Sequence, residues 1–352
     1  MSASVVPAKL PVCEPITIPE AAPKPELKPA VRLPMGTRRL PRDLRNDYTH
    51  KVAAERRNFI ARKTGAKLSN VEQYSFDPSV VQGNVENFIG VAQVPIGAAG
   101  PLLVNGEHAK GEFYVPLATT EGAVVSSYNR GMRLLTESGG VTVTVTDDGM
   151  QRAPVFLFHD AREAKKFGAW VEKNIDQIRR QAEKTTHFGK LRNIVQFAIG
   201  PLRYLRFNYA TADAAGQNMA GKATYAACEW IRATYPGEPK YYLTGNIETD
   251  KKHSAMNSIL TRGKRVIAEA RIPRELMRRY LHIDTADLAR AREIQMAGSF
   301  MAGSSNNGAH AANALTALFI ATGQDVANVA ECHAGITYSQ YYLETGDFYW
   351  SI

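Results

Sequence analysis

The sequence has few cysteines, and their arrangement excludes two classes of protein. The three cysteines are Cys13, Cys228 and Cys332, an odd number with no Cys-x-x-Cys spacing. A disulfide framework needs an even set of cysteines, and a structural zinc site needs closely spaced pairs. We therefore expect free thiols and no bound metal.

Long apolar runs and glycine-rich phosphate loops are also missing. No run of about 18 apolar residues is present, so no membrane segment is predicted. Residues 1–7 lack the basic and then apolar layout of a secretory signal, and we expect a cytoplasmic protein. No Gly-x-Gly-x-x-Gly occurs, so an ordinary Rossmann dinucleotide site is not indicated.

The net charge of +9 is concentrated near the N-terminus. Residues 1–67 hold 14 Lys and Arg against 6 Asp and Glu, and they include the pair Arg56-Arg57. We interpret this region as a solvated tail and first helix, with contact to an acidic surface as the alternative. A nucleic-acid partner is not expected, because residues 154–243 lack the glycine and aromatic strand motif of RNA-recognition modules.

The distribution of proline separates a tail from a folded remainder. Residues 1–42 hold half of the 18 prolines and are predicted to form a disordered tail. Residues 43–85 are predicted as an N-terminal helical region, with apolar residues at helical spacing between 43 and 67. A chain of 352 residues is long enough for two or three domains.

Residues 154–243 are predicted to form a small domain of their own. Strand and helix patterns follow the order β-α-β-β-α-β over residues 155–158, 160–178, 193–198, 202–209, 214–234 and 241–243. This is the ferredoxin-like (βαββαβ) order. The small domain interrupts a larger one, residues 86–153 and 244–352, in which strands and helices are mixed. We therefore predict an α+β or α/β fold.

Three segments place isolated charged groups in apolar or glycine-bearing surroundings. Residues 244–252 combine Lys251 with acidic neighbours in a turn, while Glu121 follows two threonines and Asp325 follows a glycine and a glutamine. A lysine with two isolated carboxylates suggests carbonyl chemistry. Solvated surface is the alternative for each segment taken alone.

Glu121 and Asp325 also have structural interpretations. Glu121 is predicted in the first turn of a helix over residues 122–135, where a threonine cap and the helix dipole favour a carboxylate. Asp325 follows a helix predicted over residues 309–321, for which Gly323 is a plausible C-cap. The dipole at that end repels an aspartate, so we expect Asp325 to have a partner.

Together, these segments resemble the three central motifs of the 3-hydroxy-3-methylglutaryl-coenzyme A (HMG-CoA) reductase family. The resemblance spans roughly residues 50–352 and includes Glu86–Gly90, Pro95–Pro101, Asp148–Met150 and His310–Asn313. It implies an oxidoreductase of the mevalonate pathway of isoprenoid synthesis, which reduces HMG-CoA to mevalonate and CoA. Two NADPH would supply the reducing power, with NADH as the alternative. A homodimer or larger homo-oligomer is also implied, because Glu86–Gly90 matches a dimerisation motif.

The resemblance implies three catalytic residues. Lys251 would stabilise the oxyanion formed when hydride reaches the thioester carbonyl. Glu121 would protonate the aldehyde intermediate. Asp325 would link the lysine and the glutamate into one hydrogen-bonded network.

A further set of residues is implied to bind the substrate. These are Glu86, Asn87, Arg130, Arg152, Thr244, Asn246, Asp250, Lys252, His310 and Asn313. His310 and Asn313 are three apart and are expected to share one helix face. A satisfied core histidine is the alternative for His310.

The resemblance places the nicotinamide cofactor on the small domain. The implied cofactor-binding residues are Thr186, His187, Phe188, Asp213, Gly216, Gln217 and Asn218. Gly216 near a helix start would let a phosphate approach free backbone N–H groups. His187 stands where the family has an arginine, which weakens the case for NADPH over NADH. Ala215 and Gln217 also depart from the family pattern, and Ile294 stands where a substrate-contacting lysine is usual.

The family pattern extends past the last residue of this sequence. Family members continue to a histidine near the C-terminus that protonates the departing CoA thiolate, and no residue here matches it. We therefore expect a C-terminally truncated member. The alternative function is a catalytically impaired remnant that binds acyl-CoA or nucleotide.

Overall fold

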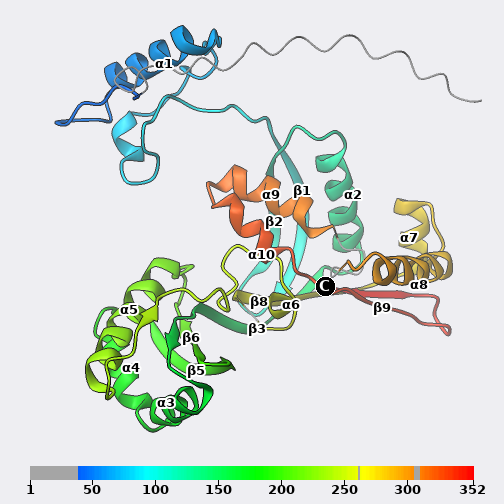
Figure 1. The fold of residues 1–352 in the computed structure, drawn as a ribbon. Helices are drawn as coiled ribbons and strands as arrows, with labels where there is room; N and C mark the ends of the chain where they lie inside the picture. The colour runs from blue at the N-terminus through cyan, green and yellow to red at the C-terminus, as the bar shows by residue number, and fades with distance from the viewer. Residues whose placement is uncertain (1–38, 261, 305–309) are drawn as a thin grey trace, which may run out of the picture. The chain divides into compact units, whose positions relative to one another are not determined.

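The computed structural model describes residues 39–260, 262–304 and 310–352 (Figure 1). Most of the tail predicted over residues 1–42 lies outside this range, as does Cys13. The chain divides into two units, residues 1–93 and residues 94–352.

The first unit contains helix α1 (His50–Thr64) and the short 3-10 helix η2 (Pro78–Val81). Helix α1 begins after Thr49, whose side chain accepts from a first-turn N–H, and ends at Gly65 in the left-handed conformation. It is shorter than the helix predicted over residues 43–67. Asp43 Oδ1 accepts from the backbone N–H two residues later at 2.8 Å, a local bond that favours a turn over a helix.

Arg56 of α1 corrects the interpretation of the basic segment as solvated. Its side chain is fully buried. It donates to the carbonyl of Phe88 at 3.3 Å, and Arg57 donates to the carbonyl of Ile89 at 2.8 Å. A buried guanidinium is tolerated only with such partners. The two arginines therefore hold the segment 86–90.

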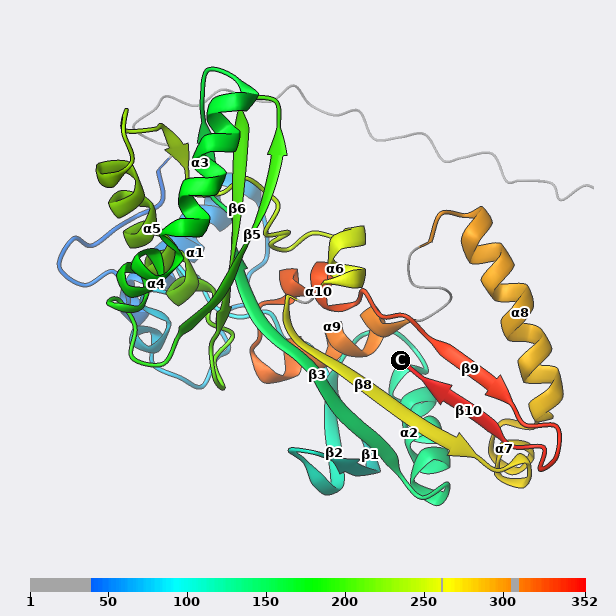
Figure 2. The same ribbon diagram turned by 90° about the horizontal axis from the view of Figure 1, so that it is seen from below.

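The second unit is built on a sheet whose long central strands are β3 (Val141–Arg152) and β8 (Gly263–Ile272). The strand order is β2-β1-β3-β8-β10-β9, with β1 (Ile96–Gly106), β2 (Lys110–Ala118), β9 (Tyr338–Tyr341) and β10 (Phe348–Ser351). β1 and β3 run parallel, and the other neighbours are antiparallel. Figure 2 shows β3 and β8 side by side along this sheet.

Helices accompany this part of the sheet, and α2, α7, α8 and α9 share apolar clusters with it. Their bounds are α2 (Val124–Glu137), α6 (Ala255–Ile259), α7 (Arg274–Leu281), α8 (Thr285–Met301), α9 (Ala311–Thr322), η3 (Val326–Asn328) and α10 (Val329–Cys332). Leu117 of β2 is buried against Ala317 of α9. Phe348 of β10 is buried with Leu134 of α2 and Met277 of α7. Each such burial contributes about 1.5–3 kcal/mol for a large apolar side chain.

A second part of the sheet continues from the end of β3. Its strands run in the antiparallel order β7-β4-β6-β5, with β4 (Val155–Leu157), β5 (Lys190–Ile199), β6 (Leu202–Ala210) and β7 (Tyr241–Tyr242). Residues 150–152 of β3 pair with residues 207–209 of β6. Strand β3 therefore belongs to both parts, and it fixes them to one another.

The helices of this second part are α3 (Ala161–Lys173), α4 (Ile175–Glu183) and α5 (Gln217–Thr234). They share one core with the strands, in which Phe167, Ile178, Phe207 and Ile231 are fully buried. The single helix predicted over residues 160–178 is wrong, because it divides at Asn174. The side chain of Asn174 donates to a carbonyl of the preceding turn at 2.8 Å, which ends α3.

The composition indicated neither a membrane segment nor a metal site, and it predicted free thiols. Within the described residues, no helix is both long and apolar enough to cross a membrane. Over the same ranges, no three His, Cys, Asp or Glu side chains gather closely enough to hold a metal ion. Cys228 and Cys332 are free thiols, as predicted.

Candidate active site

The lysine loop (Thr244–Lys252) connects β7 to α6 and has unusual backbone angles. Asn246, Thr249 and Lys251 have φ values of 67°, 59° and 52°. The left-handed conformation costs a non-glycine residue about 1 kcal/mol or more. Contacts around the loop must therefore hold it in place.

Asn257 of α6 supplies part of this support. Its side chain is buried, and Nδ2 donates to the carbonyl of Lys252 at 2.7 Å and to that of Thr249 at 3.3 Å. Its Oδ1 accepts from the Thr249 hydroxyl. The backbone of the lysine loop is thus hydrogen-bonded to α6. This contact excludes the alternative of a solvated surface turn for this segment.

Lys251 and Asp325 meet just past the end of α9. Gly323 ends this helix with φ 69°, as predicted for a C-cap, and Asp325 accepts from the Ala327 N–H at 3.1 Å. Lys251 Nζ lies 2.5 Å from Asp325 Oδ2, which is the partner that we expected for Asp325. The hydrogen bond between them raises the pKa of Lys251 and lowers the pKa of Asp325.

Asp250 connects the lysine loop with the start of helix α5. Gln217 Nε2 donates to Asp250 Oδ2 at 2.8 Å. Arg152 Nη1 lies 3.8 Å from the same oxygen. Three residues predicted for substrate and cofactor binding are therefore brought together.

Arg262 and Glu331 were not predicted, and they lie at the centre of this cluster. Arg262 Nε donates to Glu331 Oε2 at 2.8 Å, and Arg262 Nη2 lies 3.0 Å from Asp250 Oδ1. The Lys251 N–H also donates to Glu331 Oε2, at 2.6 Å. The available sequence signal was weak: Glu331 is the only charged residue in the stretch 326–332.

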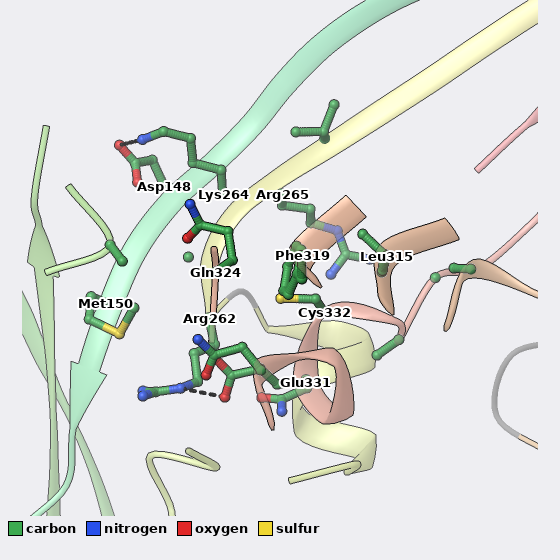
Figure 3. A pocket seen from close by; sticks show the side chains of 18 of the residues that line it. Asp148, Met150, Arg262, Lys264, Arg265, Leu315, Phe319, Gln324, Glu331 and Cys332 are labelled. Atoms are coloured by element: carbon green, nitrogen blue, oxygen red, sulfur yellow. Dashed lines mark hydrogen bonds and ion pairs between the residues drawn. The ribbon is translucent and has the colours of Figure 1, made fainter. Parts of the chain in front are cut away.

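A cavity of about 830 Å³ borders the cluster (Figure 3). Residues from β3, β8, α9, α10 and the segment before α5 line it, and its volume suits a small-molecule ligand. In Figure 3, Arg262 and Glu331 lie at one side, and Lys264 pairs with Asp148 at another. Lys264 Nζ lies 3.0 Å from Asp148 Oδ2 and donates to the carbonyl of Ala212 at 3.1 Å. Lys264 therefore ties the segment before α5 to β8.

The start of α5 fits a bound phosphate. Gly216 is the N-cap residue with φ 77°, and no side chain caps the helix there. The first-turn N–H groups therefore point outward without a side-chain acceptor, which is the arrangement that binds anions. A Cβ at Gly216 would lie 2.2 Å from Cγ2 of Thr211, so only glycine fits. Asp213 and Asn218 are exposed on either side.

The other predicted cofactor residues lie in the turn between α4 and β5. Thr186 Oγ1 accepts from the Gly189 N–H at 2.9 Å, which shapes the turn. His187 is exposed, and the Phe188 ring is 79% exposed. His187 and Phe188 are thus presented at the surface of the second part of the sheet, and Thr186 shapes the turn that presents them.

Glu121 was predicted in the first turn of a helix, and this prediction is wrong. Helix α2 begins at Val124, because Ala123 adopts a left-handed φ of 66°. The Glu121 N–H donates to Thr119 Oγ1 at 3.0 Å in the preceding turn, and its side chain is exposed. Among the described residues, no hydrogen bond or ion pair joins Glu121 to Lys251. Its charge does act on Tyr128 of α2, whose pKa is raised by burial and, to a lesser degree, by Glu121.

His310 and Asn313 are placed differently from the prediction. His310 is the N-cap residue of α9 and precedes the helix, so the two do not share a helix face. His310 is also exposed, which excludes the alternative of a core histidine. Its carbonyl accepts from the Tyr128 hydroxyl at 3.4 Å. Asn313 and Arg130 are exposed on α9 and α2.

The remaining predicted residues fall in two places. Glu86 and Asn87 are exposed in the unit that ends at residue 93, and Asn87 has φ 54°. In the lysine loop, the Thr244 hydroxyl donates to a carboxylate oxygen of Glu248. Lys252 Nζ donates to the carbonyl of Asp250 at 3.0 Å.

Comparison with known proteins identifies the family. The family model described as hydroxymethylglutaryl-coenzyme A reductase matches residues 52–352. The chain is 45% identical over 300 residues to the 3-hydroxy-3-methylglutaryl-coenzyme A reductase of Pyrococcus horikoshii, covering 84% of this chain and 72% of that protein. It is 38% identical over 333 residues to the protein of the same name from Strongylocentrotus purpuratus, covering 91% of this chain and 35% of that one.

A solved structure supports the similarity of fold. The structure of the class II 3-hydroxy-3-methylglutaryl-CoA reductase from Streptococcus pneumoniae, bound to NADPH in open conformations, is similar with a TM-score of 0.62 at 20% identity. The match covers 84% of this chain and 78% of that one. The extent of the sequence matches is decisive. The chain belongs to the hydroxymethylglutaryl-coenzyme A reductase family.

Proposed function

We propose that this chain reduces HMG-CoA to mevalonate and CoA with two NADPH. The observation that carries the proposal is the contact between Lys251 and Asp325, with Nζ 2.5 Å from Oδ2, in a chain of this family. Glu331, which accepts from the Lys251 N–H, lines the cavity. A charged amine that a substrate can reach is suited to act on a carbonyl oxygen.

Lys251 would donate to the carbonyl oxygen as negative charge develops on it. This interaction is stronger in the transition state than in the ground state, which is the condition for catalysis. Asp325 raises the pKa of Lys251 and so keeps the amine charged. The lysine remains 38% exposed, so its ammonium is accessible to a substrate.

Glu121 would supply the proton for the aldehyde intermediate, and its exposed position before α2 leaves it accessible. Arg152, Asp250 and Lys252 would orient the substrate, together with Arg130, Thr244, Asn246, His310 and Asn313. Arg152 and Asp250 already contact one another through a 3.8 Å ion pair. These assignments follow the family resemblance, and the clustering at Asp250 supports those of Arg152, Asp250 and Lys252.

NADPH, when bound, supplies the hydride. Gly216, Gln217 and Asn218 at the uncapped start of α5 would hold its phosphates. Gln217 also donates to Asp250, so the proposed cofactor site and substrate site share one hydrogen bond. Thr186, His187 and Phe188 would meet the far end of the cofactor.

We also propose the domain division given by the sequence. Residues 154–243 would be a ferredoxin-like cofactor domain inserted between residues 86–153 and 244–352, after a helical region at 43–85. The antiparallel order β7-β4-β6-β5 supports this, since it matches the 4-1-3-2 order of that fold. Exposure of Glu86 and Asn87 is consistent with a homodimer or larger homo-oligomer through their segment.

The purified chain should oxidise NADPH when given HMG-CoA, and mass spectrometry should detect mevalonate. Free mevaldehyde serves as a second substrate, because its reduction needs no proton for a CoA thiolate. The remnant that only binds acyl-CoA or nucleotide is not favoured, since the lysine loop and Asp325 are assembled. Binding of NADPH and HMG-CoA without mevalonate from either substrate would overturn the proposal.

A further inference from the structure

The backbone of Lys251 is held by a carboxylate from a distant helix. Lys251 has a left-handed φ of 52°, and its N–H donates to Oε2 of Glu331 in α10 at 2.6 Å. The same oxygen accepts from Arg262 Nε at 2.8 Å. One carboxylate oxygen therefore joins the lysine loop to a guanidinium.

Arg262 is anchored on the central sheet. Its Nη1 donates to the carbonyl of Gln151 in β3 at 2.9 Å and to that of Glu248 at 3.4 Å. Its Nη2 lies 3.0 Å from Asp250 Oδ1. The guanidinium thus contacts the sheet, the lysine loop and α10 at once, and its planar fork keeps these contacts in fixed directions.

Burial makes this pair sensitive to the loss of either partner. The Arg262 side chain is 1% exposed and that of Glu331 is 5% exposed. Removing one partner would leave the other as an unpaired buried charge, which is strongly unfavourable. The surrounding chain would then rearrange, and the lysine loop is the element that both residues contact.

The side chain of Lys251 has far less support than its backbone. It is 38% exposed, and its ion pair with Asp325, itself 51% exposed, is of the weak surface kind. The direction of the amine therefore depends on the backbone at residue 251. A return to an ordinary right-handed conformation would swing Cβ and displace Nζ from Asp325.

We propose that Glu331 and Arg262 are positioning residues, which hold Lys251 in its left-handed conformation and so aim its amine at the reacting carbonyl oxygen. The proposal rests on the proposed function for the reaction itself. Neither residue touches the substrate in this role. The proposal predicts that loss of the Glu331–Arg262 pair lowers kcat while substrate binding is largely kept.

The test uses four variants of the full chain. Glu331→Ala removes the acceptor and the charge, whereas Glu331→Gln keeps an oxygen for the Lys251 N–H. Arg262→Lys keeps a positive charge and loses the fork. Asp347→Asn is the control, because it breaks the ion pair of Asp347 with Arg271, also 2.8 Å long but more exposed, where β8 ends away from the loop.

We expect Glu331→Ala to lower kcat for mevaldehyde reduction by about 100-fold, with KM changed by less than about threefold. Glu331→Gln should retain about a tenth of the wild-type kcat, and Arg262→Lys should fall between the two. Hydrogen exchange of the peptide that covers residues 244–252 should accelerate in the same order, while peptides of α5 and β8 stay protected. Asp347→Asn should match the wild type in all three measurements.

Two outcomes would overturn the proposal. One is a Glu331→Ala variant with wild-type kcat and unchanged exchange of the lysine loop. The other is equal loss of protection across α5, β8 and the loop, which would assign the pair a purely structural role. If Glu331→Ala fails to fold, Glu331→Gln decides by the same criteria. If the wild type reduces neither substrate, the proposed function fails, and loop exchange still decides whether the pair holds Lys251.

Discussion

Lys251 Nζ and Asp325 Oδ2 lie 2.5 Å apart, although one residue follows strand β7 and the other follows helix α9. Two packing arrangements bring them together. Ala317 fixes α9 on the sheet through its contact with Leu117, and the Arg262–Glu331 pair fixes the backbone of Lys251. Glu331 lies six residues after Asp325, so the segment that carries Asp325 also contacts the backbone of Lys251.

Loss of either member of this pair should stop turnover. Lys251→Ala removes the donor to the developing oxyanion, and we expect kcat to fall by about 100- to 1000-fold. Asp325→Asn removes the charge that holds the amine and should cost a comparable factor. NADPH oxidation with HMG-CoA and with mevaldehyde measures both effects, with Asp347→Asn as the control. Near-parental turnover in either variant would remove that residue from the proposed mechanism.

The pair should stabilise the fold over a defined pH range. The pKa of Asp325 is lowered from its ordinary 3.8 by the Lys251 hydrogen bond, so its contribution is present above that value and is lost as the pH falls further. The pKa of Lys251 is raised from 10.5, so its contribution is present below that value and is lost as the pH rises through the higher folded value.

Denaturant unfolding of the wild type and of Asp325→Asn checks this window. Because both side chains are more than one-third exposed, the difference in unfolding free energy should be about 1 kcal/mol at most. It should stay constant between about pH 5 and about pH 9 and shrink in stronger acid, where Asp325 is protonated, and in stronger base, where Lys251 is deprotonated. A difference that changes near neutral pH would mean that another group controls the pair.

Gly216→Ala should weaken NADPH binding. The new Cβ would lie 2.2 Å from Cγ2 of Thr211 at a φ of 77°, so the start of α5 must move. We expect the Kd for NADPH, measured by fluorescence titration, to rise at least about tenfold. Gly298→Ala in α8 is the matched control, because a Cβ there meets nothing within 4 Å. Equal affinities in the two variants would exclude a phosphate at the start of α5.

His187→Arg should increase discrimination between NADPH and NADH. A guanidinium offers two parallel donors to a phosphate, whereas an imidazole offers a single donor in one direction. The exposed position of His187 leaves room for the longer side chain. The ratio of kcat/KM for NADPH over NADH should therefore be larger in the variant than in the wild type. An unchanged ratio would mean that residue 187 does not face the cofactor phosphate.

Local sequence patterns predicted elements well where one turn or one strand decides the outcome. The C-cap at Gly323 was predicted from residue type, since only glycine adopts the left-handed conformation at little cost. The glycine at the start of α5 was predicted from the family resemblance. Reasoning from residue type also placed Glu121 inside a helix and joined α3 to α4. It failed there because Ala123 adopts a left-handed conformation that its residue type disfavours, and because the Asn174 side chain bonds to the backbone.

The sequence by itself determined the family, through motifs in their order, and named Lys251, Asp250 and Asp325 as the groups to examine. Only the tertiary structure decided which partners they have. Arg262 and Glu331 have at most a weak local signature, because a buried ion pair depends on elements that are distant in the chain. The left-handed backbone at Lys251 is likewise disfavoured by residue type, and it persists because contacts from α6, α10 and Arg262 outweigh its local cost.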